Sequence, residues 1–139
     1  MHILVDTNTV MDALAERPPF DISAKELLLK IETKTVQGSL AATTLTTIFY
    51  LMRKLKGNEK AKQLVADLLR YFEICAIDRH VLQNALNKSM SDFEDAVQDS
   101  AAELNGIPII VTRNAGNFVG STRQILDAEA FLKQLGQTP

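Results

Sequence analysis

The stretch His2-Ile3-Leu4-Val5-Asp6-Thr7-Asn8 decides the fold: a short apolar run stops at an aspartate and continues into residues that cap helices. The apolar part predicts a buried strand. Its last three residues are all able to cap a helix over 9–15. Ligands of open parallel sheets bind outside the carboxyl ends of the strands. A carboxylate buried at such an end is hydrogen-bonded, paired or bound to a metal ion, so Asp6 is the first candidate site residue.

Short apolar runs then alternate with segments that have the 3.6-residue apolar spacing of helices. Such alternation predicts an α/β fold with a parallel sheet and right-handed crossovers. We expect one domain over residues 1–136 and a tail over 137–139. Ser91, with Glu94 three residues on, predicts the start of a helix over 92–104. The expected strands are 2–5, 39–43, 73–77, 109–112 and 124–126.

The composition is that of an ordinary globular chain. It has 139 residues, of which 46% are hydrophobic and 23% charged, and its net charge is −2. This balance excludes a strongly basic nucleic-acid-binding protein, although a local basic patch stays compatible with it. No apolar run approaches the roughly 18 residues of a membrane span, and no signal peptide precedes the first strand. We therefore expect a cytoplasmic protein with no membrane partner.

Three aspartates on the predicted helix over 92–104 are candidates to join Asp6. Asp92, Asp95 and Asp99 follow at spacings of three and four, which place side chains on one helix face. Together with Asp6 they would suit Mg²⁺ or Mn²⁺, which prefer oxygen ligands and retain several waters. The alternative is that Asp92 interacts with the helix dipole while the other two face water.

A basic cluster lies in the middle of the chain. Its simplest interpretation is a solvated helical face and loop, and contact with nucleic acid is the alternative. The cluster consists of Arg53, Lys54, Lys56, Lys60 and Lys62.

Three blocks, in this order, resemble the PIN domain family. The first is Val5-Asp6-Thr7-Asn8 with Asp12, and the second is Asp92-Phe93-Glu94-Asp95-Ala96. The third is Ile110-Val111-Thr112-Arg113-Asn114, followed by Asn117-Phe118. The order and spacing of the three blocks extend over nearly the whole chain.

The resemblance implies a three-layer α/β/α domain, with a central parallel sheet of four to five strands and an acidic pocket for Mg²⁺ or Mn²⁺. It implies a metal-dependent endoribonuclease that acts on RNA. Many small proteins of this kind are VapC-type toxins, which form homodimers and are inhibited by a cognate antitoxin. RNA, an antitoxin and a second copy of the chain are therefore the expected partners.

The resemblance also assigns roles to residues. Asp6 matches the first acidic position and Asp95 the acidic position on the helix, with Asp92 and Asp99 as accessory groups on the same face. The expected catalytic residues are Asp6, Asp95 and Asp99, and the expected metal ligands are Asp6, Asp92, Asp95 and Asn117. Residues expected to orient the carboxylates or to contact substrate, with Arg113 facing a phosphate, are Thr7, Asn8, Asp12, Thr47, Thr112, Arg113 and Asn114.

Two positions depart from the family pattern. Thr47 stands where the family usually has a glutamate, and Asn117 stands where it usually has an aspartate before a phenylalanine. A hydroxyl or an amide ligates through oxygen but brings no negative charge, so metal affinity should fall. One alternative is therefore a degenerate PIN domain that binds RNA or protein without cleavage. Another is an α/β domain whose aspartates serve only as helix caps.

Overall fold

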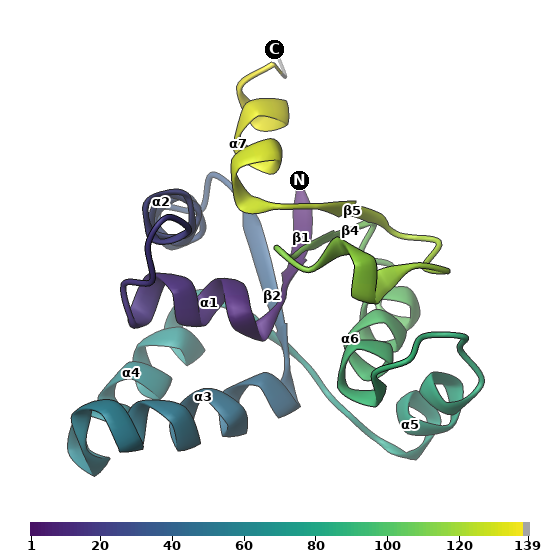
Figure 1. Cartoon of the computed structure of the whole chain (residues 1–139), viewed down its shortest axis with the longest axis horizontal. Coiled ribbons are helices and arrows are strands. Elements are labelled where there is room, and N and C mark those ends of the chain that lie inside the picture. Colours follow the sequence, from purple (N-terminus) through teal and green to yellow (C-terminus); the bar gives the residue numbers. More distant parts are fainter. Residues whose placement is uncertain (138–139) are drawn as a thin grey trace.

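The computed structural model describes residues 1–137, which form a five-stranded sheet with helices around it (Figure 1). The strands are β1 (His2–Val5), β2 (Gln37–Ala41), β3 (Glu73–Cys75), β4 (Ile109–Val111) and β5 (Gln124–Leu126). The first four α-helices are α1 (Thr7–Leu14), α2 (Asp21–Glu32), α3 (Ala42–Lys56) and α4 (Asn58–Tyr71). The remaining helices are α5 (Arg79–Leu86), α6 (Phe93–Leu104), the short 3-10 helix η1 (Ala115–Phe118) and α7 (Ala128–Gly136).

All strand pairs in the sheet are parallel, and the strand order is β3-β2-β1-β4-β5. The strand that carries the opening motif, β1, is therefore central, with β2 on one side and β4 on the other. Because parallel strands end at the same edge of a sheet, the residues after β1 and β4 lie next to each other. The backbone confirms this, since the Asp6 N–H donates to the Val111 carbonyl at 2.9 Å.

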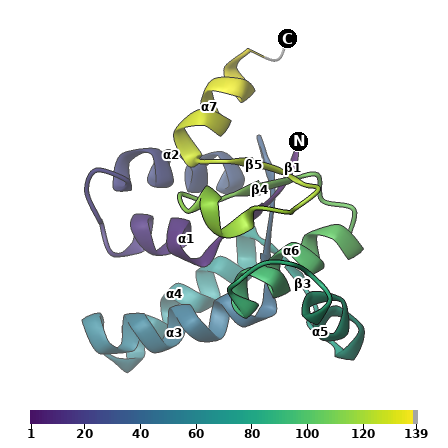
Figure 2. The same cartoon turned by 45° about the vertical axis from the view of Figure 1, so that its right-hand side comes forward.

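Side chains of the central strand alternate between two apolar clusters, one on each face of the sheet. Ile3 and Val5 belong to a cluster with residues of α1–α4 and α7, whereas Leu4 belongs to a cluster with residues of α5 and α6. The two helical layers are visible on opposite sides of the strands (Figure 2). The predicted three-layer α/β/α architecture is confirmed.

Several predicted boundaries are wrong; the third strand, for example, ends at Cys75 rather than at residue 77, and the first helix covers Thr7–Leu14 rather than 9–15. The second strand covers Gln37–Ala41 rather than 39–43, because the chain already turns into α3 at Ala42. Gly38 lies in this strand, and a Cβ there would approach the Ile31 side chain to 2.7 Å, so glycine permits close packing of α2 on the sheet. The N-cap of α6 is Asp92 rather than Ser91, since its Oδ1 accepts from the Asp95 N–H at 3.0 Å.

The C-terminal tail was predicted over 137–139. Gln137 is the C-cap of α7, and the two following residues lie outside the part of the chain that the structure describes. Among the helices of residues 1–137, none is long and apolar enough to cross a membrane.

Candidate active site

An acidic pocket lies at the carboxyl edge of the sheet, where β1 leads into α1 and the N-terminus of α6 approaches. Its volume is about 170 Å³. Four of the nine lining side chains are carboxylic acids, and none is Lys, Arg or His. The lining residues are Asp6, Thr7, Asn8, Thr47, Leu51, Asp92, Glu94, Asp95 and Asn117.

Asp6 is the most firmly held of the four acids. It is only 2% exposed, and both carboxylate oxygens accept hydrogen bonds from buried side chains. Gln98 donates through Nε2 to Oδ1 at 2.8 Å, and Thr112 donates through Oγ1 to Oδ2 at 2.9 Å. Such bonds fix the orientation of a carboxylate and offset part of its desolvation.

The N-cap and the first turn of α6 bring three further acids to the pocket, Asp92, Glu94 and Asp95. Burial raises the pKa of Asp95 to about 7, and the charges of Asp6, Asp92 and Glu94 add to this, while a hydrogen bond with Asn117 opposes it. The pKa of Glu94 is also raised, by burial and then by Asp6 and Asp92. The acids therefore repel one another in a site without a balancing cation.

The two positions that depart from the family pattern both line this pocket. Thr47 lies on α3, and its hydroxyl donates to the Thr43 carbonyl at 3.2 Å. Asn117 lies on η1 and forms a side-chain hydrogen bond with Asp95. The alignment of these two residues with acidic positions, inferred from the motifs, is thus consistent with their place in the fold.

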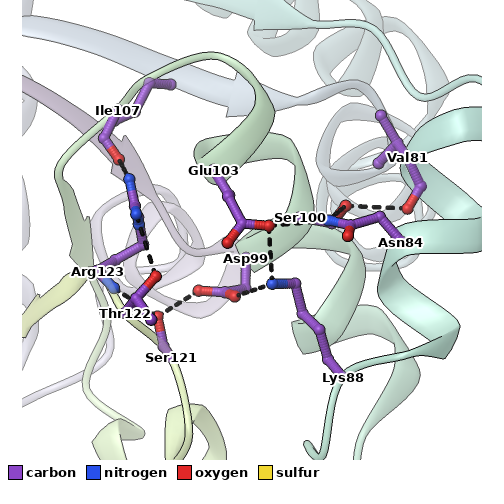
Figure 3. Close-up of polar contacts among 10 residues, drawn as sticks. All are labelled: Val81, Asn84, Lys88, Asp99, Ser100, Glu103, Ile107, Ser121, Thr122 and Arg123. Atoms are coloured by element: carbon purple, nitrogen blue, oxygen red, sulfur yellow. Dashed lines mark hydrogen bonds and ion pairs between the residues drawn. The ribbon is translucent and has the colours of Figure 1, made fainter.

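Asp99 does not line the acidic pocket, in contrast to its predicted place beside Asp95. Its side chain is 1% exposed and is engaged on both oxygens (Figure 3). Lys88 approaches Oδ2 at 2.9 Å, and the Ser121 hydroxyl donates to Oδ1. Lys88 also binds Glu103 at 3.2 Å. Asp99 is therefore a neutralised structural carboxylate, and helical spacing misplaced it because the spacing does not reveal a cation brought from another segment.

Two further predicted site residues form a separate group. Arg113 donates through Nε to Asp12 Oδ2 at 2.9 Å, and its guanidinium lies 4.5 Å from the centre of the Phe20 ring. Asp12 and Arg113 line a second cavity of about 230 Å³ rather than the acidic pocket. Arg113 was predicted to face a phosphate, but it is paired with a buried carboxylate. Asn114 contributes its backbone N–H to Thr112 Oγ1 at 3.0 Å.

Sequence reasoning missed two residues of the site. Glu94 was interpreted only as part of a helix cap, yet it lines the pocket and accepts from Thr7 Oγ1 at 3.5 Å. Gln98 is fully buried and holds Asp6, while its own Oε1 has no hydrogen-bond partner. Its spacing of three from Asp95 was a usable signal, since that spacing places both side chains on one helix face.

The pocket fits a hard divalent cation by its donor chemistry. Within residues 1–137, no three His, Cys, Asp or Glu side chains lie close enough to hold a metal ion by themselves. The pocket does offer carboxylate, amide and hydroxyl oxygens, and no Lys, Arg or His lines it to compensate the negative charge. Mg²⁺ and Mn²⁺ bind through one or two carboxylates and retained waters, which such a set supplies.

Comparison with known proteins identifies relatives of the same fold. A family model described as the PIN domain matches residues 2–116. VapBC2 from Rickettsia felis, solved with a DNA fragment from its promoter, has a TM-score of 0.71 at 17% identity, over 91% of this chain and 98% of that one. FitAcB from Neisseria gonorrhoeae has a TM-score of 0.65 at 21% identity, over 91% and 98%.

A third similar structure is VapC20 from Mycobacterium tuberculosis, a toxin described as cleaving the sarcin-ricin loop. Its TM-score is 0.65 at 14% identity, over 88% of this chain and 98% of that one. No curated protein sequence matches the chain.

Proposed function

The chain belongs to the PIN domain family, and from this premise we propose that it is a metal-dependent endoribonuclease. The observation that carries the proposal is the uncompensated acidic pocket at the carboxyl edge of the sheet, with Asp6 fixed by two buried hydrogen bonds. Hydrolysis of a phosphodiester needs a group that stabilises developing charge on phosphate and a deprotonated water. A bound Mg²⁺ or Mn²⁺ supplies both effects.

The residues of the pocket take separate roles in this proposal. Asp6 and Asp95 would hold the ion, helped by Asp92 and by the amide oxygen of Asn117. Thr112 and Gln98 keep the Asp6 carboxylate oriented, since both donate to it. Such supporting hydrogen bonds typically change metal affinity by 10- to 100-fold. Glu94 adds a fourth carboxylate, next to Thr7.

Asp95 also holds a proton for part of the time near neutral pH in the absence of the ion. The pKa of Asp95 is raised to about 7, so a proton leaves this carboxylate when a cation binds near neutral pH.

We further propose that the protein is the toxin of a toxin–antitoxin pair and acts on cellular RNA in the cytoplasm as a homodimer. Support for the antitoxin comes from a solved structure of similar fold that is described as a toxin–antitoxin complex from Klebsiella pneumoniae. Support for RNA comes from VapC20, which is described as cleaving the sarcin-ricin loop. The homodimer follows from the family resemblance alone.

The test is cleavage of a labelled RNA by purified protein with Mn²⁺. We expect Asp6→Asn and Asp95→Asn to abolish cleavage, while Asp67→Asn on α4, which lies outside the acidic pocket, retains it. Full activity of the unchanged protein in excess chelator would refute the proposal.

A second candidate function is a PIN domain that binds RNA or a protein partner without cleavage. Thr47 and Asn117 favour it, because they line the pocket without adding charge. If the protein is inert with Mn²⁺ and the double change Thr47→Glu, Asn117→Asp creates activity, the binding function is supported. If the double change leaves Mn²⁺ affinity unaltered, Thr47 and Asn117 do not face the ion.

A further inference from the structure

The acidic pocket does not explain how a polyanion stays bound. Phosphodiesters carry a negative charge at every nucleotide, and affinity for nucleic acid comes largely from Lys and Arg at phosphates. None of the nine side chains that line the pocket is a cation. The groups that retain RNA must therefore lie outside it.

Helix α3 leads away from the pocket and connects it to the basic cluster. Thr47 and Leu51 line the pocket from this helix. Tyr50 and Lys54 follow Thr47 at spacings of three and seven, which place them on the same stripe of the helix. With a rise of 1.5 Å per residue, the stripe from Thr47 to Lys54 is about 10 Å long. Figure 1 shows α3 extending outward from the carboxyl end of β2.

The exposed end of this stripe combines an aromatic ring with two cations. Tyr50 is 49% exposed. Lys54 Nζ lies 4.3 Å from the centre of its ring, and Arg53 Cζ lies 5.9 Å from it. Within residues 1–137, neither cation forms an ion pair with a carboxylate. An exposed ring for stacking beside unpaired cations is the combination with which proteins hold single strands.

The charge around this point opposes that of the chain as a whole. Within 53–62 the five cations of the basic cluster, all exposed, accompany a single carboxylate, Glu59. The net charge of the chain is nevertheless −2. The exposed cations of the basic cluster therefore form a local excess of positive charge at the α3–α4 end of the molecule.

We propose that Tyr50, Arg53 and Lys54 form a binding track on α3 for single-stranded RNA that flanks the cleaved bond. Arg53 and Lys54 contact successive phosphates, and one base stacks on Tyr50. The track rests on the proposed function in so far as RNA is the substrate of the acidic pocket. Charge complementarity selects RNA over an apolar protein partner as the occupant.

The experiment measures binding of a labelled, unstructured RNA on the order of ten nucleotides long by fluorescence anisotropy, in chelator so that no metal-dependent cleavage occurs. We expect Tyr50→Ala to weaken binding at least about fivefold and Tyr50→Phe to preserve it, because phenylalanine still stacks. The double change Arg53→Gln, Lys54→Gln should reduce the slope of log K against log salt by about 1.4, the value for two phosphates of a single strand. Lys133→Gln on α7 is the matched control.

Unaltered affinity and salt dependence in both α3 variants would overturn the track. So would a loss of binding that follows a change of oligomeric state in sedimentation, which would make this face an interface between copies. A cleavage assay with Mn²⁺ separates this inference from the proposed function. RNA binding that depends on α3 without cleavage would refute the nuclease and retain the track, whereas cleavage without dependence on α3 would do the reverse.

Discussion

Asp95 and Asp99 lie one turn apart on α6, and the structure predicts that their asparagine variants change stability in opposite directions. Loss of one partner from a buried ion pair typically costs 3–5 kcal/mol. In Asp99→Asn, Lys88 Nζ keeps its ion pair with Glu103 Oε1 at 3.2 Å, and the Lys88 side chain is 16% exposed. Both facts reduce the penalty, so we expect the free energy of unfolding to fall by about 2–4 kcal/mol. With an unfolding entropy of roughly 2.1 cal/mol/K per residue, Tm should fall by about 7–14 °C.

The opposite effect is expected for Asp95→Asn in the absence of metal. The pKa of Asp95 is raised from its ordinary value of 3.8 to about 7 in the folded protein. Between these two pH values the folded protein therefore binds a proton that the unfolded chain has released. A raised carboxyl pKa gives a contribution that is complete below pH 3.8 and is lost as pH rises through 7. The unchanged protein therefore loses stability over this window, because the charged carboxylate of Asp95 is desolvated by burial and then repelled by Asp6, Asp92 and Glu94. Asp95→Asn removes the loss.

The assay is thermal unfolding of the unchanged protein, Asp95→Asn and Asp99→Asn in chelator at pH 5 and pH 8. At pH 8 we expect Tm to rise in Asp95→Asn and to fall in Asp99→Asn, and the gain in Asp95→Asn should shrink at pH 5, where the carboxyl is protonated. If Asp99→Asn also raises Tm at pH 8, then Asp99 belongs to the repelling acids and its pairing with Lys88 is wrong.

Three further outcomes follow from the same structure. Free Mn²⁺ at about 100 times its Kd should stabilise the protein by about 2.7 kcal/mol, and a calorimetric scan should show no such gain in Asp6→Asn. Thr112→Val removes a donor at 2.9 Å from Asp6 and should weaken Mn²⁺ binding about 10- to 100-fold, measured by titration; an unchanged Kd would contradict the role of this bond. Gly120 has a φ of +97°, so Gly120→Ala should cost about 1–2 kcal/mol, whereas Gly116→Ala, where an added Cβ meets nothing within 4 Å, should be neutral in denaturant unfolding.

Much of the fold was predictable because it depends on local patterns. The apolar run 2–5 and the residues after it specify a buried strand and a turn into α1, and the structure has both. The end of β2 was less predictable, because Ala41 is extended and Ala42 is helical although both residues are alanine. Neither apolar periodicity nor turn residues distinguish the two, and the start of α3 is fixed by packing on the sheet.

A residue of the acidic pocket was predictable where its own position along the chain decided its place in the fold. Asp6 follows a buried strand, so topology alone brings it to the carboxyl edge of the sheet. The role of Gln98 depends on an approach of α6 to β1 across 92 positions of the chain, which no local pattern encodes. Lys88, in the segment after α5, likewise forms the ion pair with Asp99. The sequence shows that the lysine is present but does not show which carboxylate it meets.

Helix α6 thus contains two aspartates whose surroundings differ, because Asp99 is paired with Lys88 whereas Asp95 lies among other carboxylic acids. The segment that includes η1 is held to this helix at two points, by Asn117 at Asp95 and by Ser121 at Asp99. The second contact lies beside the Lys88 ion pair, so it contributes stability without adding repulsion. The first contact meets a carboxyl whose pKa is raised, so it lies where charge is costly. The stable contact holds the segment in place, and Asn117 can therefore face an acidic pocket whose own charges oppose folding until a cation binds.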